Sequence, residues 1–167
     1  MGQISTYVFT HEDQPGFVHD SLEQLIAAGV ISPAPDLECY APEEASWARD
    51  AFDFLGTHQS PLPFIIPQDP AIEPKCPACD SDVAAAYYDT INRVQDEGGE
   101  VDWREVRIPC PQCGEATRIT ALKDSVGVYC AREYLYFSDI MVDDLRAFQE
   151  KLRELLPGIE VKSYHYT

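Results

Sequence analysis

Basic residues are scarce in this 167-residue chain: it has 12 lysine and arginine residues against 29 aspartate and glutamate residues, and the formal net charge is −17 at pH 7. Nucleic acids are polyanions, and proteins that bind them usually present clustered basic side chains. We therefore regard nucleic-acid binding as disfavoured and expect any partner to be a cationic protein. The alternative is that the acidity serves solubility alone.

The acidic excess is concentrated near the N-terminus. Residues 1–70 contain 11 acidic residues and one basic residue, Arg49, whereas residues 71–167 contain 18 acidic and 11 basic residues. An acidic surface of this kind attracts a basic partner over a long distance. The charge therefore predicts a non-enzymatic protein that binds another protein through an acidic surface. An inhibitor or immunity protein against a basic toxin or nuclease is one concrete form of that function.

The sequence also lacks membrane and export signals. No apolar run approaches the roughly 18 residues that cross a bilayer, and the first ten residues have neither the basic nor the apolar region of a secretory signal. Met1, Gly2 and Thr6 match the short myristoylation pattern, but a first β-strand is the simpler interpretation. We expect a cytoplasmic chain in a reducing compartment, where its six cysteines do not form three disulfides.

Motifs typical of common enzyme classes are missing too. The sequence contains no Gly-x-Ser-x-Gly elbow, no phosphate-binding loop and no dinucleotide glycine pattern. His11 and Glu12 begin like a metalloprotease helix, but Pro15 stands where the second histidine is needed. Asp143 and Asp144 are adjacent, so on a helix they point in different directions. We therefore predict no catalytic residues and no organic cofactor.

Four of the six cysteines form two matched pairs, Cys76-Pro-Ala-Cys79 and Cys110-Pro-Gln-Cys113. Two intervening residues allow both thiolates of a pair to reach one ion from a tight turn, and two such turns supply a tetrahedron of sulfur ligands. Thirty residues separate the pairs, which is enough for a helix and a return strand. The spacing predicts one structural Zn²⁺ bound by Cys76, Cys79, Cys110 and Cys113.

The residues that flank each pair agree with a metal-binding turn. Such a turn usually needs a left-handed backbone just after its second cysteine, and Gly114 and Asp80 stand at that position. Pro77 and Pro111 fix φ inside the turns without removing a needed donor. Both pairs therefore have the local form of a zinc knuckle.

Two other chemistries remain open at these cysteines. A Cys-Pro-x-Cys pair also resembles the active site of thioredoxin-like enzymes, so a thiol-disulfide oxidoreductase is the alternative enzyme class. Iron is the alternative metal, because Cys-Pro-x-Cys-Gly resembles a rubredoxin knuckle. Cys39 and Cys130 lie outside the pairs, and we predict that both are core thiols.

Hydrophobic periodicity and turn residues predict an α+β fold, a small mixed sheet with packed helices and a Cys₄ zinc ribbon within the chain. Three regions are expected: an N-terminal α/β region over 1–73, the zinc ribbon with an inserted helix over 74–123, and a strand-helix-strand segment over 124–167, together forming one compact domain. The expected strands cover 4–9, 101–108, 116–122, 129–137 and 159–166, and the expected helices 20–28, 42–55, 83–97 and 142–156. The five prolines of 60–74 predict an extended or looping link.

The order of knuckle, helix, strand, knuckle, strands, helix and strand resembles that of small bacterial zinc-ribbon proteins of uncharacterised function. The resemblance covers about residues 74–167, and its carriers are the two cysteine pairs, the helix after Asp82 and the final strand-helix-strand. It implies four zinc ligands and no particular reaction, because ribbons serve many unrelated proteins.

One strand carries a second pattern, in which Arg132, Tyr134 and Tyr136 share a face. RNA-recognition sheets stack bases on aromatic residues in this way, and Tyr164 and Tyr166 could extend such a surface. Aromatic residues are also ordinary sheet residues, and the net charge opposes RNA. We expect packing within the sheet, with nucleic-acid binding by the zinc ribbon as the alternative.

Overall fold

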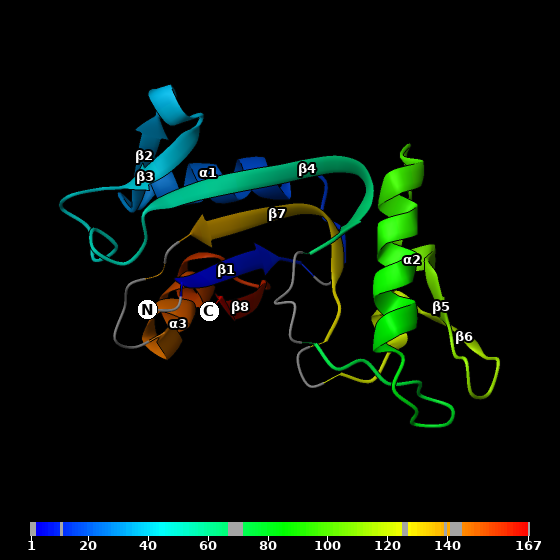
Figure 1. The fold of residues 1–167 in the computed structure, drawn as a ribbon. Helices are drawn as coiled ribbons and strands as arrows, with labels where there is room; N and C mark the ends of the chain where they lie inside the picture. The colour runs from blue at the N-terminus through cyan, green and yellow to red at the C-terminus, as the bar shows by residue number, and fades with distance from the viewer. Residues whose placement is uncertain are drawn as a thin grey trace. The chain divides into compact units, whose positions relative to one another are not determined.

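The computed structural model describes residues 3–10, 12–66, 72–124, 127–138, 140 and 145–166 (Figure 1). Its helices are α1 (Phe17–Ala27), α2 (Ala84–Glu97) and α3 (Leu145–Leu155). Its strands are β1 (Gln3–Phe9), β2 (Ile31–Ala34), β3 (Cys39–Pro42), β4 (Phe54–Ile65), β5 (Arg107–Pro109), β6 (Ala116–Arg118), β7 (Cys130–Ser138) and β8 (Glu160–Tyr166). The α+β class is confirmed. Among the described residues, no helix is long and apolar enough to cross a membrane.

Six strands form one sheet in the order β2-β3-β4-β7-β1-β8, and β5 and β6 form a separate hairpin. Strand β1 runs antiparallel to both of its neighbours, with Tyr7 opposite Tyr136 on one side and Lys162 on the other. Strands β7 and β8, which flank α3, therefore run in the same direction. The terminal strand-helix-strand segment is therefore a parallel crossover, with β1 between its two strands.

The chain divides into two compact units. Unit 1 contains residues 1–59 and 133–167, and unit 2 contains residues 60–132. Strands β4 and β7 cross the boundary and are the two connections between the units. Each unit buries its own hydrophobic cluster. The region boundaries predicted at residues 73 and 123, and the prediction that the regions form one compact domain, stay predictions.

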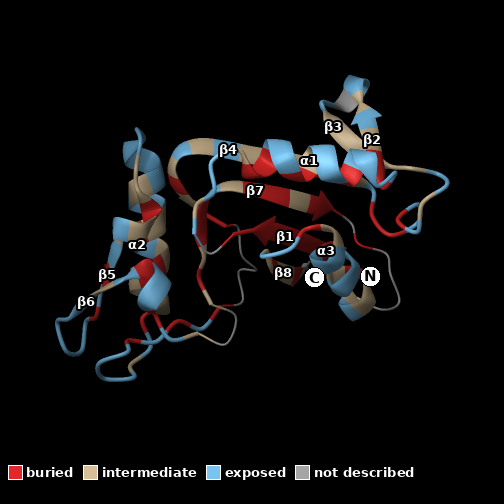
Figure 2. Cartoon of the chain, turned by 180° about the vertical axis from the view of Figure 1, so that it is seen from behind, coloured by how far each residue is buried: buried red, intermediate tan, exposed pale blue. Residues whose placement is uncertain are grey.

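The core of unit 1 lies between one face of the sheet and helices α1 and α3. Leu135 and Phe137 of β7 are fully buried there, and the Phe137 ring meets Phe52 and Phe148 edge-on at centroid distances of 4.9 and 5.6 Å. Figure 2 shows the consequence for α1, which is buried along one side and exposed along the other. Burial of such side chains is the main favourable term in folding.

The opposite face of the sheet in unit 1 is rich in tyrosine. The Tyr7 ring stacks on Tyr136 at 5.3 Å and meets Tyr134 edge-on at 5.7 Å, and Tyr164 is 3% exposed. A Cβ atom on Gly56 would lie 3.2 Å from the Tyr136 ring, so glycine allows this ring to approach the β4 backbone. Packing within the sheet accounts for these tyrosines.

Several sequence predictions fall outside the described residues. They concern Met1, Gly2, His11, the side chain of Tyr166, Asp143, Asp144 and the first turn of the helix predicted at 142–156.

The helix predicted over 42–55 is wrong. Residues 43–53 form turns, and β3 and β4 occupy the flanks. The backbone N–H groups of Ser46, Arg49 and Ala51 each donate to the carbonyl three residues earlier, and the Ser46 hydroxyl binds the Glu43 carbonyl. A serine hydroxyl that hydrogen bonds to a nearby backbone carbonyl competes with the regular backbone hydrogen bonds of a helix. The segment therefore buries Ala48, Ala51 and Phe52 from a series of turns.

The first helix begins earlier than predicted. A side chain from a distant strand accepts hydrogen bonds from the backbone N–H groups at its N-terminus. The helix predicted over 20–28 would need Ser21 and Gln24 as a capping box, but α1 starts at Phe17 and Ser21 is buried within it. The Glu133 carboxylate of β7 instead accepts the backbone N–H groups of Gly16 and Val18, at 3.0 and 3.2 Å. A carboxylate at a helix N-terminus also interacts favourably with the helix dipole.

This contact predicts a stability effect. Replacing Glu133→Ala leaves two helix N–H groups without their acceptor, so we expect the free energy of unfolding to fall by about 1–2 kcal/mol. Glu133→Gln keeps one oxygen acceptor and should cost less. Urea denaturation followed by the helix signal measures both, and Glu154→Ala, at an exposed position of α3, is the control. A Glu133→Ala loss no larger than the control contradicts the assignment.

Candidate metal centre

The two predicted knuckles bring four thiols into one cluster in unit 2. The Sγ atoms of Cys76 and Cys113 lie 3.7 Å apart, and those of Cys79 and Cys110 lie 3.6 Å apart. All four sulfur atoms lie within 4.8 Å of one another. A regular tetrahedron with metal–sulfur bonds of about 2.3 Å places its sulfurs about 3.8 Å apart. The cluster therefore has the size and ligand type to hold a metal ion.

Both knuckles have the same backbone. In the first, the N–H of Asp80 donates to the Cys76 carbonyl at 2.8 Å, and Asp80 has a φ of 63°. In the second, the N–H of Gly114 donates to the Cys110 carbonyl at 3.0 Å, and Gly114 has a φ of 77°. The left-handed residue predicted after each pair is confirmed. This turn points both cysteines of a pair toward the same side.

Asp80 adopts a left-handed backbone conformation, which is costly in free energy for residues other than glycine. A lysine side chain contacts the Asp80 carboxylate. Lys123 Nζ lies 3.1 Å from Asp80 Oδ1, and this hydrogen bond lowers the pKa of Asp80. Lys123 is itself fixed by a pair of backbone hydrogen bonds with Lys75, at 2.7 and 3.0 Å. The segment after the second knuckle thus supports the first knuckle. Sequence reasoning missed this role because 43 residues separate the ion-pair partners.

Short elements of unit 2 position the knuckles. The second knuckle lies at the tip of the β5-β6 hairpin, in which Ile108 is fully buried. After the first knuckle, Asp82 Oδ1 accepts the N–H of Ala84 at 2.8 Å, and α2 follows. Helix α2 buries Tyr87 against the same core. The predicted hairpin and inserted helix are confirmed, but the strands predicted over 101–108 and 116–122 are too long. Residues 103–105 and 119–121 form 3-10 turns, which leaves only the three-residue strands β5 and β6.

The four thiols differ in exposure. Cys76 and Cys110, the first cysteine of each pair, are 1% and 4% exposed and belong to the core of unit 2, whereas Cys79 and Cys113 are exposed. One half of the cluster is therefore anchored in packed side chains and the other half faces solvent. Four protein sulfurs fill a tetrahedron, so the arrangement suits a structural ion rather than one with an open position for substrate.

Without a bound cation, the local environments of the closely packed thiols give Cys79 and Cys113 different pKa values. Hydrogen bonds from the side chain and backbone of Ser81 lower the pKa of Cys79 to about 6. At Cys113 the Glu115 backbone N–H lowers the pKa, but desolvation and the neighbouring thiols outweigh it and raise the pKa to about 12. One thiolate thus disfavours the next, and a dication would offset that repulsion.

The remaining two cysteines do not share one environment. Cys130 is 7% exposed, and burial raises its pKa to about 12, so the core thiol predicted there is confirmed. Cys39 lies in β3 with intermediate exposure, outside both buried clusters. The prediction of a core thiol is wrong for Cys39, because β3 is short and pairs with β2 near the edge of the sheet.

Another group with metal-ligand chemistry lies on α1. His19 Nδ1 is 3.3 Å from Asp20 Oδ1, and His19 Nε2 is 3.7 Å from Glu23 Oε1. All three residues are exposed, as expected of ion pairs on a solvated helix face. The i,i+4 spacing of His19 and Glu23 was the only sequence signal for it.

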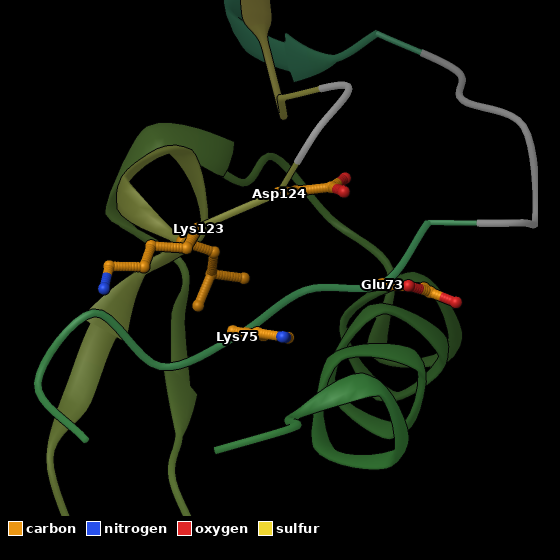
Figure 3. Close-up of a pocket in the computed structure, with 5 residues that line it drawn as sticks. Glu73, Lys75, Lys123 and Asp124 are labelled. Carbon is orange, nitrogen blue, oxygen red and sulfur yellow. The ribbon is translucent and has the colours of Figure 1, made fainter. Parts of the chain in front are cut away.

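A hollow of about 440 Å³ lies beside the Lys75–Lys123 pair. Figure 3 shows its charged lining, with Glu73 and Asp124 as well as the two lysines. The Lys123 ammonium in this view points away from the two carboxylates. The lining thus mixes both signs of charge and favours neither an anion nor a cation.

The acidities of the thiols predict selective alkylation. In the reduced, metal-free protein at pH 7, Cys79 is exposed and ionised, so iodoacetamide should modify it before Cys113, which is exposed but protonated. Peptide mapping after a short pulse measures the order. Ser81→Ala should slow the reaction at Cys79 by raising its pKa. Equal rates at Cys79 and Cys113 would contradict this prediction.

Comparisons with protein-family models, with curated proteins and with solved structures found no match to this chain.

Proposed function

We propose that this chain is a non-enzymatic zinc protein, in which one structural Zn²⁺ held by Cys76, Cys79, Cys110 and Cys113 stabilises unit 2. The observation that carries the proposal is the separation of the sulfurs, 3.6 and 3.7 Å across the two knuckles. These distances match a tetrahedral zinc–thiolate site and greatly exceed a disulfide bond of about 2.05 Å. Zinc is preferred to iron because only the knuckles, not the residues around them, resemble rubredoxin.

The ion also has a physical role in this fold. Two of its ligands, Cys76 and Cys110, are part of the hydrophobic cluster of unit 2, whose secondary structure beyond α2 is short. Structural zinc sites contribute on the order of 10–16 kcal/mol of apparent binding free energy in small fingers. The cluster of unit 1 includes none of the four ligands. Metal binding is therefore expected to support unit 2 much more than unit 1.

A ligand substitution tests both parts of this proposal. Protein purified without added metal should contain one zinc per chain by elemental analysis, and Cys110→Ser should lower the zinc content below about a tenth of an equivalent, because metal affinity depends on every ligand. Hydrogen exchange should then rise in residues 60–132 and change little in unit 1. Cys39→Ser, which removes a thiol outside the cluster, is the matched control and should retain zinc.

Two outcomes would contradict the zinc proposal. Zinc retained at one equivalent in Cys110→Ser would remove that cysteine from the ligand set. A metal-free protein whose cysteine pairs cycle between dithiol and disulfide in a glutathione buffer would support the thiol-disulfide oxidoreductase instead. Loss of exchange protection in both units would show that they unfold together.

The distribution of charge favours a second function, the binding of a basic protein. Unit 1 holds 17 of the 29 acidic residues and five of the 12 basic residues, a net charge of −12, whereas unit 2 holds the other 12 acidic and seven basic residues, a net charge of −5. Such a field attracts cations and repels nucleic acid. We infer that unit 1 presents an acidic surface to a cationic protein, as an inhibitor or immunity protein would.

Salt provides the test of this second function. A pull-down from the native cell at low ionic strength should recover basic proteins, and their yield should fall at about 0.5 M salt, because the Debye length is then only about 4 Å. Mass spectrometry identifies the proteins retained. Recovery of acidic or neutral proteins alone, at a yield that salt does not change, would leave the charge as a solubility feature.

A further inference from the structure

A groove in unit 1 lies where α1 meets the residues that follow α3. Its volume is about 170 Å³. Of its lining residues, Phe17, Ser21 and Leu156 are buried, and Gln14, Asp20 and Gln24 are exposed. The lining thus combines buried, mainly apolar groups with exposed residues whose side chains carry oxygen acceptors.

We propose that this groove binds a lysine or arginine side chain of a cationic protein partner. The proposal rests on the acidic-surface function inferred above, and it identifies the place on unit 1 and the chemical group that is recognised. It concerns one anchoring side chain rather than the whole interface.

The lining suits a long basic side chain. Lysine and arginine carry an apolar stem that packs on hydrophobic surface while the charged end remains in contact with water, and Phe17, Leu156 and Ile159 provide that surface. The Gln14 and Gln24 amide oxygens and the Asp20 carboxylate are acceptors for the donors of an ammonium or guanidinium group. Ser21, a small and buried residue, also lines the groove.

The charge around the groove selects a cation over an anion. None of the described residues that line it is basic, and unit 1 has a net charge of −12. On α1, Asp20 also contacts His19, whose other ring nitrogen lies 3.7 Å from Glu23. The larger hollow of unit 2 differs because Lys75 and Lys123 line it. The groove of unit 1 is therefore the better match for a basic side chain.

A peptide titration tests the groove directly. The probe is the acetylated, amidated tripeptide Gly-Arg-Gly, added to ¹⁵N-labelled protein, and its control contains citrulline, which has the shape of arginine without its charge. We expect saturable amide shifts at residues 14–24 and 156–159 with the arginine peptide and much smaller shifts with the citrulline peptide. Ser21→Met should block the groove and reduce these shifts.

Two charge variants distinguish binding in the groove from attraction to the overall negative charge of unit 1. Asp20→Asn should weaken arginine-peptide binding about two- to fivefold, the range expected for an exposed ion pair. Glu44→Gln removes the same charge from an exposed turn of unit 1 and should leave the affinity unchanged within experimental error. Asp20→Asn avoids the folding risk of Ser21→Met, which changes a buried position.

Three results would contradict the proposal that the groove binds a basic side chain. They are equal shifts from the arginine and citrulline peptides, an equal loss of affinity in Asp20→Asn and Glu44→Gln, and shifts spread over the acidic surface. If the pull-down recovers basic proteins in a salt-dependent manner while the amide signals of the groove residues do not shift, the groove proposal is wrong and the acidic-surface function stands. If neither experiment detects a cationic ligand, both proposals are wrong.

Discussion

The close approach of four cysteine thiols is the constraint on which unit 2 depends. Sulfur atoms 3.6 and 3.7 Å apart cannot all carry negative charge without a cation, because like charges at that distance oppose further ionisation. The left-handed residues after each pair, the β5-β6 hairpin and the Lys123–Asp80 contact all serve to hold the thiols at this separation. Unit 1 reaches stability differently, through a continuous hydrophobic layer between sheet and helices.

The four-cysteine cluster could be predicted because the information that specifies each cysteine pair is local. Each pair carries its spacing, its proline and its left-handed residue within five consecutive positions, so the geometry of one knuckle hardly depends on the rest of the chain. The same holds for α2 and for the strands β1 and β8, whose pattern and turn residues are contiguous. For such segments, local preference and the final fold agree.

The two failures differ in range: a local turn replaces one predicted helix, and a distant residue determines where another begins. Ala48, Ala51, Phe52 and Leu55 have the spacing of a helix face, yet Ser46 and successive tight turns produce the same burial without a helix. The acceptor for the N-terminus of α1 is Glu133, which is 117 residues from Gly16. Local spacing cannot identify such a partner, because the sheet that brings β7 beside α1 forms only in the complete fold.

The connections of unit 2 have an evolutionary consequence. Unit 2 leaves unit 1 after Gln59 and returns at Glu133, and these two side chains are hydrogen bonded at 3.2 Å. Because β4 and β7 are neighbours in the sheet, a tight turn of about two to five residues could join them and keep the strand order. Unit 2, with its cysteine cluster, is thus placed as an insertion in a β-hairpin, the kind of site where whole modules are gained or lost with little cost to their host.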